Sequence, residues 1–339
     1  MTLYPTNLDY YENWSTIYAD IPQTVEVMRG YGAIMLEDFL RERRGYYNFV
    51  FVSRPHNIKH LNFILGKENF LKSARIIYDA EAIFSIRDYE YKRLNQIPFT
   101  EIERQKAIME ETQLAKNSDR IITVSRQEQQ IFIEQGYSNV SLLGHSISLY
   151  PAPKSFGERE NLLFVGSIYN LKSPNADSIL WLVSEIFPLI LKHLGSVELL
   201  IVGNNTVAEM KQKIYSFNNP SVKFLGKVDD LTPFYDRSRL FVAPTRYAAG
   251  VPYKVHEAAA YGLPIVTTSL IARQLEWEHE KELLVADDAV HFARQCVRLY
   301  QDSTLWNELK KNVLKRVENE CSPSFFSEKL NSIFSFKAD

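Results

Sequence analysis

Short apolar runs bounded by polar residues recur along the chain and predict the strands of an α/β protein. In the C-terminal half they cover 162–165, 197–202, 222–225, 239–243 and 265–268. The segment between the last two runs has a helix start and a helix stop, and it has the length of a βαβ crossover between parallel strands. We therefore predict a parallel sheet with intervening helices in this half of the chain.

A second set of apolar runs predicts another α/β domain in the N-terminal half. They cover 47–53, 74–79, 120–125 and 140–143. Residues 1–46 have a weaker pattern, with an aromatic loop between fragments at 2–5 and 25–28. Prolines and polar residues between 150 and 160 form the best linker in the chain. We therefore predict domains at 1–153 and 154–321, followed at 322–339 by an amphipathic helix that begins at Ser322 and Pro323.

Length and composition narrow the classes of protein. The 339 residues suit two domains, and a net charge of −2 gives no support to nucleic acid as a partner. The two cysteines, Cys296 and Cys321, are too few for a disulfide framework and lack metal-ligand spacing. No run reaches the roughly 18 apolar residues that span a bilayer, and the N-terminus has no signal-peptide pattern. We expect a cytoplasmic protein whose contact with the inner face of the membrane is at most peripheral.

The stretch 239–268 contains a strand, a polar turn, a helix start and the next strand. Pro252 suits the first turn of a helix, and Gly262 with Pro264 ends that helix. Ligands of parallel sheets bind beyond the carboxyl ends of the strands, where a helix N-terminus offers free backbone N–H groups. We therefore expect an anion at this turn.

Charged residues in the same stretch extend this expectation to a nucleotide. Arg246 in the turn and Lys254 in the first helical turn would meet phosphate oxygens, and Gly250 would let the backbone approach them. Glu257, three residues past Lys254 on the same helix face, would accept hydrogen bonds from ribose hydroxyls. The alternative is a solvated helix face on which these side chains form an ordinary ion pair.

Other predicted strand ends also carry candidate residues. Glycines follow three of the apolar runs and allow close backbone approach, at Gly166, Gly203 and Gly226. Asp79 ends another run and Glu81 comes two residues later, but two carboxylates without a third ligand favour helix capping and hydrogen bonding over a metal site. His145 follows the run at 140–143 and would lie at the mouth of an interdomain cleft, where we favour a structural role over a catalytic one.

Three motifs together resemble the donor site of bacterial glycosyltransferase family 4, the group 1 glycosyltransferases. They are R-Y-A-A-G-V-P-Y-K-V-H-E-A-A-A-Y-G-L-P-I-V-T-T at 246–268, FVGS at 164–167 and LIVG at 200–203. The resemblance covers 155–320 well and 47–150 loosely. It implies the GT-B arrangement of two Rossmann-like domains, with an acceptor-side domain at 1–153, a donor domain at 154–321 and a last helix that crosses back to the first domain.

The resemblance also implies a reaction. A hexosyl group would pass from a nucleotide sugar to a hydroxyl of a glycan or lipid-linked acceptor in bacterial surface polysaccharide synthesis. The anomeric configuration would be retained, and neither a metal nor a cofactor would take part. Arg246, Lys254 and Glu257 would be the catalytic residues, because they would stabilise the departing nucleoside diphosphate or hold its ribose. Further contacts with the donor would come from Gly166, Ser167, Gly203, Asn204, Gly250, Val251 and Tyr253.

Two departures from the family pattern leave alternatives open. The family often has another glutamate eight positions before Glu257, where this chain has Ala249. A degenerate sugar-nucleotide binding module therefore stays open beside the transferase, and so does a nucleotide-sugar epimerase of the same shape, which would also need the anion site. By this pattern the first domain also lacks its opening strand and glycine turn, because the first glycine is Gly30 and 2–5 resembles a second strand. We therefore hypothesise that the numbered chain starts inside the acceptor-side domain and transfers sugar poorly.

Overall fold

The computed structural model describes residues 1–7 and 21–335. Most of the aromatic loop expected between 2–5 and 25–28 lies outside these residues, as do the last four residues of the helix expected at 322–339.

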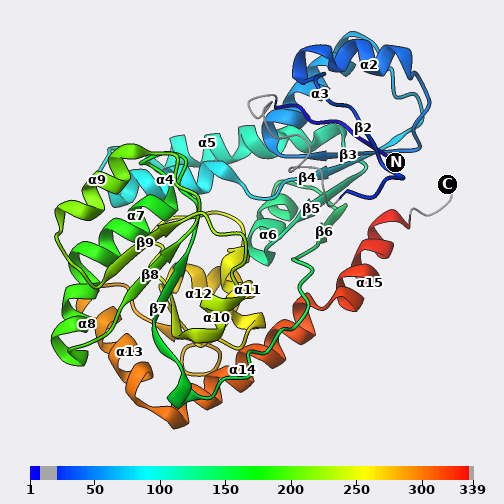
Figure 1. The fold of residues 1–339 in the computed structure, drawn as a ribbon. Coiled ribbons are helices and arrows are strands. Elements are labelled where there is room, and N and C mark those ends of the chain that lie inside the picture. Colours follow the sequence, from blue (N-terminus) through cyan, green and yellow to red (C-terminus); the bar gives the residue numbers. More distant parts are fainter. Residues whose placement is uncertain (8–20, 336–339) are drawn as a thin grey trace.

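The described residues form two larger parallel sheets and one short strand pair (Figure 1). The six-stranded sheet consists of β7 (Glu160–Val165), β8 (Leu199–Val202), β9 (Val222–Gly226), β10 (Ser238–Ala243), β11 (Ile265–Thr267) and β12 (Leu284–Val285). The four-stranded sheet consists of β3 (Phe49–Ser53), β4 (Arg75–Asp79), β5 (Arg120–Thr123) and β6 (Val140–Leu142). The parallel pair consists of β1 (Thr2–Leu3) and β2 (Glu26–Val27). Every predicted apolar run contains a strand, and β12 is a strand that the pattern does not predict.

The strand order of the larger sheet is β9-β8-β7-β10-β11-β12. Numbered from β7, this is the order 3-2-1-4-5-6 of a doubly wound dinucleotide-binding sheet. The direction of winding reverses between β7 and β10, so the turns that follow these two strands diverge and leave room between them. In sheets of this kind, ligands bind at that switch point.

Helices cover both faces of the sheets. In the N-terminal half they are α2 (Leu36–Glu42), α3 (Pro55–Lys67), α4 (Phe84–Leu94), α5 (Glu101–Thr112) and α6 (Arg126–Glu134). In the C-terminal half they are α7 (Pro174–Trp181), α8 (Phe187–Leu194), α9 (Ala208–Ser216), α10 (Thr232–Arg237), α11 (Tyr253–Ala260), α12 (Ser269–Leu275), α13 (Ala289–Gln301), α14 (Ser303–Cys321) and α15 (Pro323–Phe334). Short 3₁₀ segments lie at Ala33–Met35, Gln113–Asn117 and Phe156–Glu158.

Side-chain caps start many of these helices, because a Ser, Thr or Asp oxygen there accepts a hydrogen bond from an otherwise unpaired backbone N–H group. Such caps are Thr100, Ser125, Ser173, Asp288, Asp302 and Ser322. The cap at Ser322 is the helix start that the sequence predicts. Between α7 and α8 the chain forms a π-helical segment, Leu182–Ile186, where the pattern predicts one regular helix. Pro188 supplies a physical reason, since it has no N–H group for the carbonyl of Ser184.

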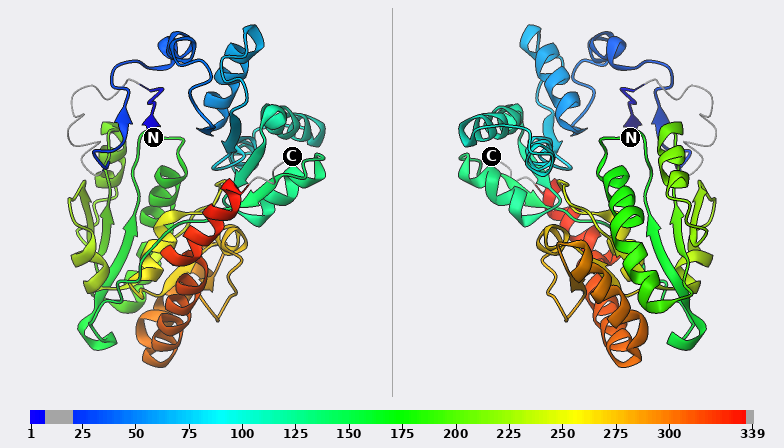
Figure 2. Two further views of the ribbon diagram at one scale, coloured as in Figure 1. Left: turned by 90° about the vertical axis from the view of Figure 1, so that its right-hand side faces the viewer. Right: turned by 90° about the vertical axis from the view of Figure 1, so that its left-hand side faces the viewer.

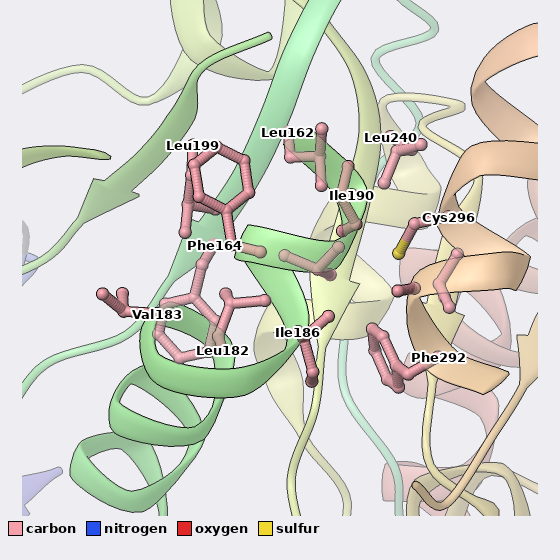
Figure 3. Close-up of a cluster of buried hydrophobic side chains, with 14 of the residues drawn as sticks. Leu162, Phe164, Leu182, Val183, Ile186, Ile190, Leu199, Leu240, Phe292 and Cys296 are labelled. Atoms are coloured by element: carbon pink, nitrogen blue, oxygen red, sulfur yellow. The ribbon is translucent and has the colours of Figure 1, made fainter. Parts of the chain in front are cut away.

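The core of the C-terminal half lies on both faces of the larger sheet because successive strand residues point to opposite faces. Leu162 and Phe164 of β7 are fully buried against α7, α8 and α13, whereas Leu163 is buried on the other face with α11 and α14. Figure 3 shows labelled side chains of β7, β8 and β10 gathered with those of the helices, Phe292 and Cys296 of α13 among them. This packing fixes the edge of the sheet at which β7 and β10 end.

The chain passes between the two sheets twice. The first passage connects β6 to β7 and contains the predicted boundary at 153/154. In the second, α14 and α15 run from the larger sheet to the smaller one (Figures 1 and 2). Ile333 of α15 is buried there with Ile77 and Ile122. The two passages touch, because the Ile147 N–H group donates to the Cys321 carbonyl at 2.7 Å. In the described residues, no helix is long and apolar enough to cross a membrane.

Candidate functional site

The turns after β7 and β8 meet at the carboxyl edge of the larger sheet. Gly203 has a φ of +146°, and a Cβ atom there would lie 2.3 Å from the carbonyl oxygen of Gly166. A Cβ atom at Gly166 would in turn lie 2.8 Å from Cγ of Asn175. These close contacts within the protein therefore require glycine at both positions. The sequence pattern does not reveal the contacts.

Lys254 lies in the first turn of α11 and is linked to the turn after β7. Its Nζ donates to Asn175 Oδ1 at 2.6 Å, and Asn175 Nδ2 donates to the Ser167 carbonyl at 2.8 Å. Nζ also lies 4.4 Å from the ring centroid of Phe164. Burial lowers the pKa of Lys254 to about 7. Because Asn175 is uncharged, the protonated lysine keeps its full charge for an incoming anion.

Arg246 lies on the turn after β10 and forms a two-pronged ion pair with Asp177 of α7. Its Nε and Nη2 donate to the two carboxylate oxygens at 3.0 and 2.5 Å. The guanidinium group also lies 4.9 Å from the ring centroid of Trp181. Arg246 is therefore already neutralised, whereas the sequence pattern suggests two equivalent cations.

Glu257 lies one turn after Lys254 but has a different partner. Its carboxylate accepts a hydrogen bond from the Tyr235 hydroxyl at 2.7 Å, and burial raises the pKa of Tyr235. The Tyr235 ring stacks on Tyr261 at a centroid distance of 4.6 Å. These contacts fix the position of the carboxylate without neutralising its charge.

The other predicted donor residues border the same edge. Asn204 accepts a backbone hydrogen bond from Ile168 at 2.7 Å, so the turns after β7 and β8 are also joined there. Val251 is partly buried against the core, and Tyr253 is 50% exposed. Gly250 has a φ of +73° and lies against residues of the N-terminal half.

His145 pairs with a second histidine that the sequence prediction does not include. The Nδ1 atoms of His145 and His256 are 3.0 Å apart, and the His145 ring packs edge-on against Tyr253 at 5.1 Å. Burial lowers both pKa values, that of His256 to about 3, so the buried ring is neutral at pH 7. The pair joins the first interdomain passage to α11, which favours the structural interpretation of His145.

Asp79 and Glu81 take part in a hydrogen-bonded network at the end of β4. The Ser53 hydroxyl donates to both carboxylates at 3.1 Å, and Arg54 Nε donates to Glu81 at 2.9 Å. Burial raises the pKa of Asp79. Within residues 1–7 and 21–335, no group of three or more His, Cys, Asp or Glu side chains could hold a metal ion. These contacts agree with the hydrogen-bonding interpretation of the two carboxylates.

The half of the chain that contains this edge matches a known protein family. Residues 159–302 match the family model described as glycosyl transferases group 1. We call residues 159–302 the glycosyltransferase domain, after the family that they match. The capsular polysaccharide biosynthesis glycosyltransferase CapM of Staphylococcus aureus is 29% identical over 155 residues, which are 44% of this chain and 40% of CapM. The matches to curated relatives span only 40–44% of the relatives' own lengths.

Solved structures extend the similarity of fold beyond the glycosyltransferase domain. HepE of Anabaena, crystallised in complex with UDP and glucose, aligns with a TM-score of 0.67 and 16% identity over 92% of this chain and 86% of HepE. A TarM mutant of S. aureus, in complex with fondaparinux, alpha-GlcNAc-glycerol and UDP, aligns with a TM-score of 0.70 and 15% identity over 90% of this chain and 59% of TarM. The predicted family and the predicted GT-B fold are confirmed.

The sequence prediction misses several partners of the site residues, Tyr235 and His256 among them. Asn175 and Asp177 of the glycosyltransferase domain bind Lys254 and Arg246, and Glu128 of α6 binds Gly250. The spacing S-P-N-A-D at 173–177 places polar side chains in the first turn of the helix after the FVGS turn, and this signal could have found Asn175 and Asp177. Glu128 stands in an S-x-x-E capping pattern, which predicts a helix start but gives no sign of a contact across the molecule.

Proposed function

We propose that the chain is a retaining, metal-independent glycosyltransferase. It moves a sugar from a nucleoside diphosphate sugar to a hydroxyl of a glycan or lipid-linked acceptor in bacterial surface polysaccharide synthesis. The observation that carries this proposal is Lys254, a cation with an uncharged hydrogen-bond partner, beside the winding switch point of a group 1 domain. The name of CapM and the UDP complexes of HepE and TarM support the same class of reaction.

Charge on the leaving diphosphate explains the proposed roles. The bond between the anomeric carbon and a diphosphate oxygen breaks, a bond to the acceptor oxygen forms, and the acceptor proton is released. Negative charge therefore grows on the diphosphate as the transition state is approached. Lys254 and the free N–H groups at the start of α11 would stabilise that charge more strongly than they stabilise the bound donor. This arrangement performs the electrostatic role that a metal ion has in other transferases.

The depressed pKa of Lys254 makes nucleotide binding depend on pH. A diphosphate favours the ammonium form of Lys254. At any pH above about 7, the pKa of Lys254 in the protein without ligand, binding must therefore add a proton to this side chain. We expect the affinity for a nucleoside diphosphate to fall by up to about tenfold per pH unit between roughly pH 7.5 and 9, above the phosphate pKa of about 6. Calorimetry in buffers of different ionisation enthalpy would detect the proton uptake. A pH profile as steep in Lys254→Ala as in the wild type would contradict this assignment.

Glu257 should affect the nucleoside and not the phosphates. We expect Glu257→Gln to weaken binding of a nucleoside diphosphate, because the amide is a poorer acceptor for ribose hydroxyls than the carboxylate. Affinity for inorganic pyrophosphate should stay close to that of the wild type. Tyr235→Phe is the matched control, since it removes the hydroxyl that binds Glu257 and keeps the carboxylate. Equal losses for both ligands in Glu257→Gln would make Glu257 a structural residue.

Product analysis tests the proposed function. A thermal-shift panel of nucleotide sugars would first identify the donor, because a bound ligand raises the unfolding temperature. Incubation of that donor with and without acceptor glycans then separates three outcomes. A transferase forms a new glycosidic bond only with acceptor, an epimerase converts the donor alone, and a binding module does neither. The anomeric configuration of the product tests retention, and activity in the presence of a chelator tests metal independence.

A further inference from the structure

The carboxylate of Glu128 joins the two halves of the molecule. Glu128 belongs to α6, in the N-terminal half, and is only 3% exposed. Its Oε1 accepts two backbone hydrogen bonds of 3.0 Å, from Ile83 in the same half and from Gly250 in the glycosyltransferase domain. Its Oε2 accepts a third hydrogen bond from the Ser125 hydroxyl at 3.0 Å.

We propose that Glu128 is a positioning residue for the donor site. It holds the turn 246–251, which carries Arg246 and leads into α11, against the N-terminal half. The inference rests on the proposed function, because that function makes this turn a phosphate-binding element. Glu128 acts through the backbone of Gly250 and does not itself touch the donor.

The surroundings of Gly250 show how closely the turn is seated. A Cβ atom at Gly250 would lie 3.2 Å from the carbonyl oxygen of Glu81 and 3.3 Å from Cβ of Ala82. At the other end of the turn, the Tyr247 ring meets Tyr91 of α4 edge-on at a centroid distance of 5.2 Å. The N-terminal half therefore contacts the turn at two positions that are three residues apart.

The hydrogen bonds of Glu128 restrict the position of the turn more strongly than the ring contact between Tyr91 and Tyr247 does. A ring contact tolerates small rotations, whereas two N–H groups that share one carboxylate oxygen fix its position relative to both halves. The three donors to this carboxylate are all uncharged, and burial raises the pKa of Glu128. Such a costly buried carboxylate is retained only where its hydrogen bonds are complete, so removal of the side chain leaves the Gly250 N–H group without a protein partner.

Glu111 provides a matched control, because it binds the N-terminus of the same helix, α4. Glu111 of α5 accepts hydrogen bonds from the N–H groups of Phe84 and Ser85 at 2.7 and 2.8 Å, next to the Ile83 N–H group that Glu128 binds. Both glutamates thus hold the first turn of α4, but these two hydrogen bonds of Glu111 stay within the N-terminal half. Glu111→Ala therefore disturbs α4 without removing an acceptor from the turn at 246–251.

The test combines hydrogen exchange with calorimetric binding of a nucleoside diphosphate. In Glu128→Ala we expect amides 246–251 to exchange at least about tenfold faster and the affinity to fall by about 5- to 150-fold. Glu128→Gln, which keeps an oxygen acceptor, should restore both properties to within a few-fold of wild type. Glu111→Ala should speed exchange at 83–86 but leave 246–251 and the affinity unchanged. Wild-type exchange at 246–251 in Glu128→Ala, or an equal affinity loss in Glu111→Ala, would overturn the proposal.

A second variant covers the case in which Glu128→Ala does not fold. Gly250→Ala leaves the Glu128 site in the N-terminal half intact but places a methyl group against Glu81, so the turn must move away. We expect the same faster exchange at 246–249 and a comparable loss of affinity. Unchanged exchange there would contradict the proposed seating of the turn. The two readouts are hydrogen exchange and nucleotide binding, and neither measures sugar transfer, so a failure of the transferase proposal itself would be seen separately in the product analysis.

Discussion

Lys254→Ala should weaken binding of a nucleoside diphosphate by roughly 10- to 150-fold, the largest loss of affinity that we expect from a side chain that touches the donor itself. The substitution removes a charge-assisted hydrogen bond worth about 1.5–3 kcal/mol to the phosphates. Lys254 keeps its charge for the ligand because its partner is the neutral amide of Asn175. Calorimetric titration of the folded variant measures the change.

Exposed Lys211 of α9 is the matched control for this prediction. Lys211→Ala removes the same charge at the molecular surface, where its ammonium group lies 5.7 Å from the Tyr215 ring. We expect its affinity to match that of the wild type. If both variants bind as tightly as the wild type, the anion site does not lie at the start of α11.

Gly203→Ala should produce the largest loss of stability among the glycine substitutions. The residue has a φ of +146°, and its new methyl group would lie 2.3 Å from the Gly166 carbonyl oxygen, a backbone atom that cannot turn aside. Backbone strain alone costs about 1–3 kcal/mol, and displacement of the turn after β7 adds to it. Chemical denaturation would measure the lower free energy of unfolding.

Gly66→Ala should instead raise the free energy of unfolding. Gly66 lies in α3, and apart from its chain neighbours and the backbone of its own helix no atom lies within 4 Å of its Cβ position; alanine favours a helix over glycine by about 0.5–1 kcal/mol. The two substitutions add the same methyl group, so their difference isolates the local geometry. If the two variants had equal stability, the close approach between the turns after β7 and β8 would not be as tight as the structure describes.

The sequence predicts the strands and the edge at which the site lies, because both depend on local patterns. Apolar runs mark buried parallel strands, and a proline–lysine start after a strand marks the N-terminus of α11. Local patterns cannot predict side-chain partners from distant segments. Asp177 is 69 residues from Arg246, and Glu128 is 122 residues from Gly250. The sequence therefore suggests two equivalent cations, whereas the structure distinguishes a neutralised arginine from a lysine whose partner is uncharged.

The glycines show the same limit in another form. Their positions after strands are visible in the sequence, but the reason for them is not. Gly166 and Gly203 are required because two turns of the same sheet meet, and Gly250 because the opposite half of the molecule lies against it. The distances between these glycines and the atoms around them depend on how whole strands and helices pack. They do not depend on the residues that are adjacent along the chain.

The hydrogen bond between Ile147 and Cys321 joins the two passages of the chain, and Lys310 Nζ joins them a second time at the Ala152 carbonyl. A pair of polypeptide segments that are fixed to each other restricts the relative motion of the halves that they connect. Sliding and separation would stretch both segments, while rotation about their common contact needs only a few backbone torsions to change. Any rotation about this contact would also have to bend or break the hydrogen bond between Glu128 and Gly250, which joins the same two halves.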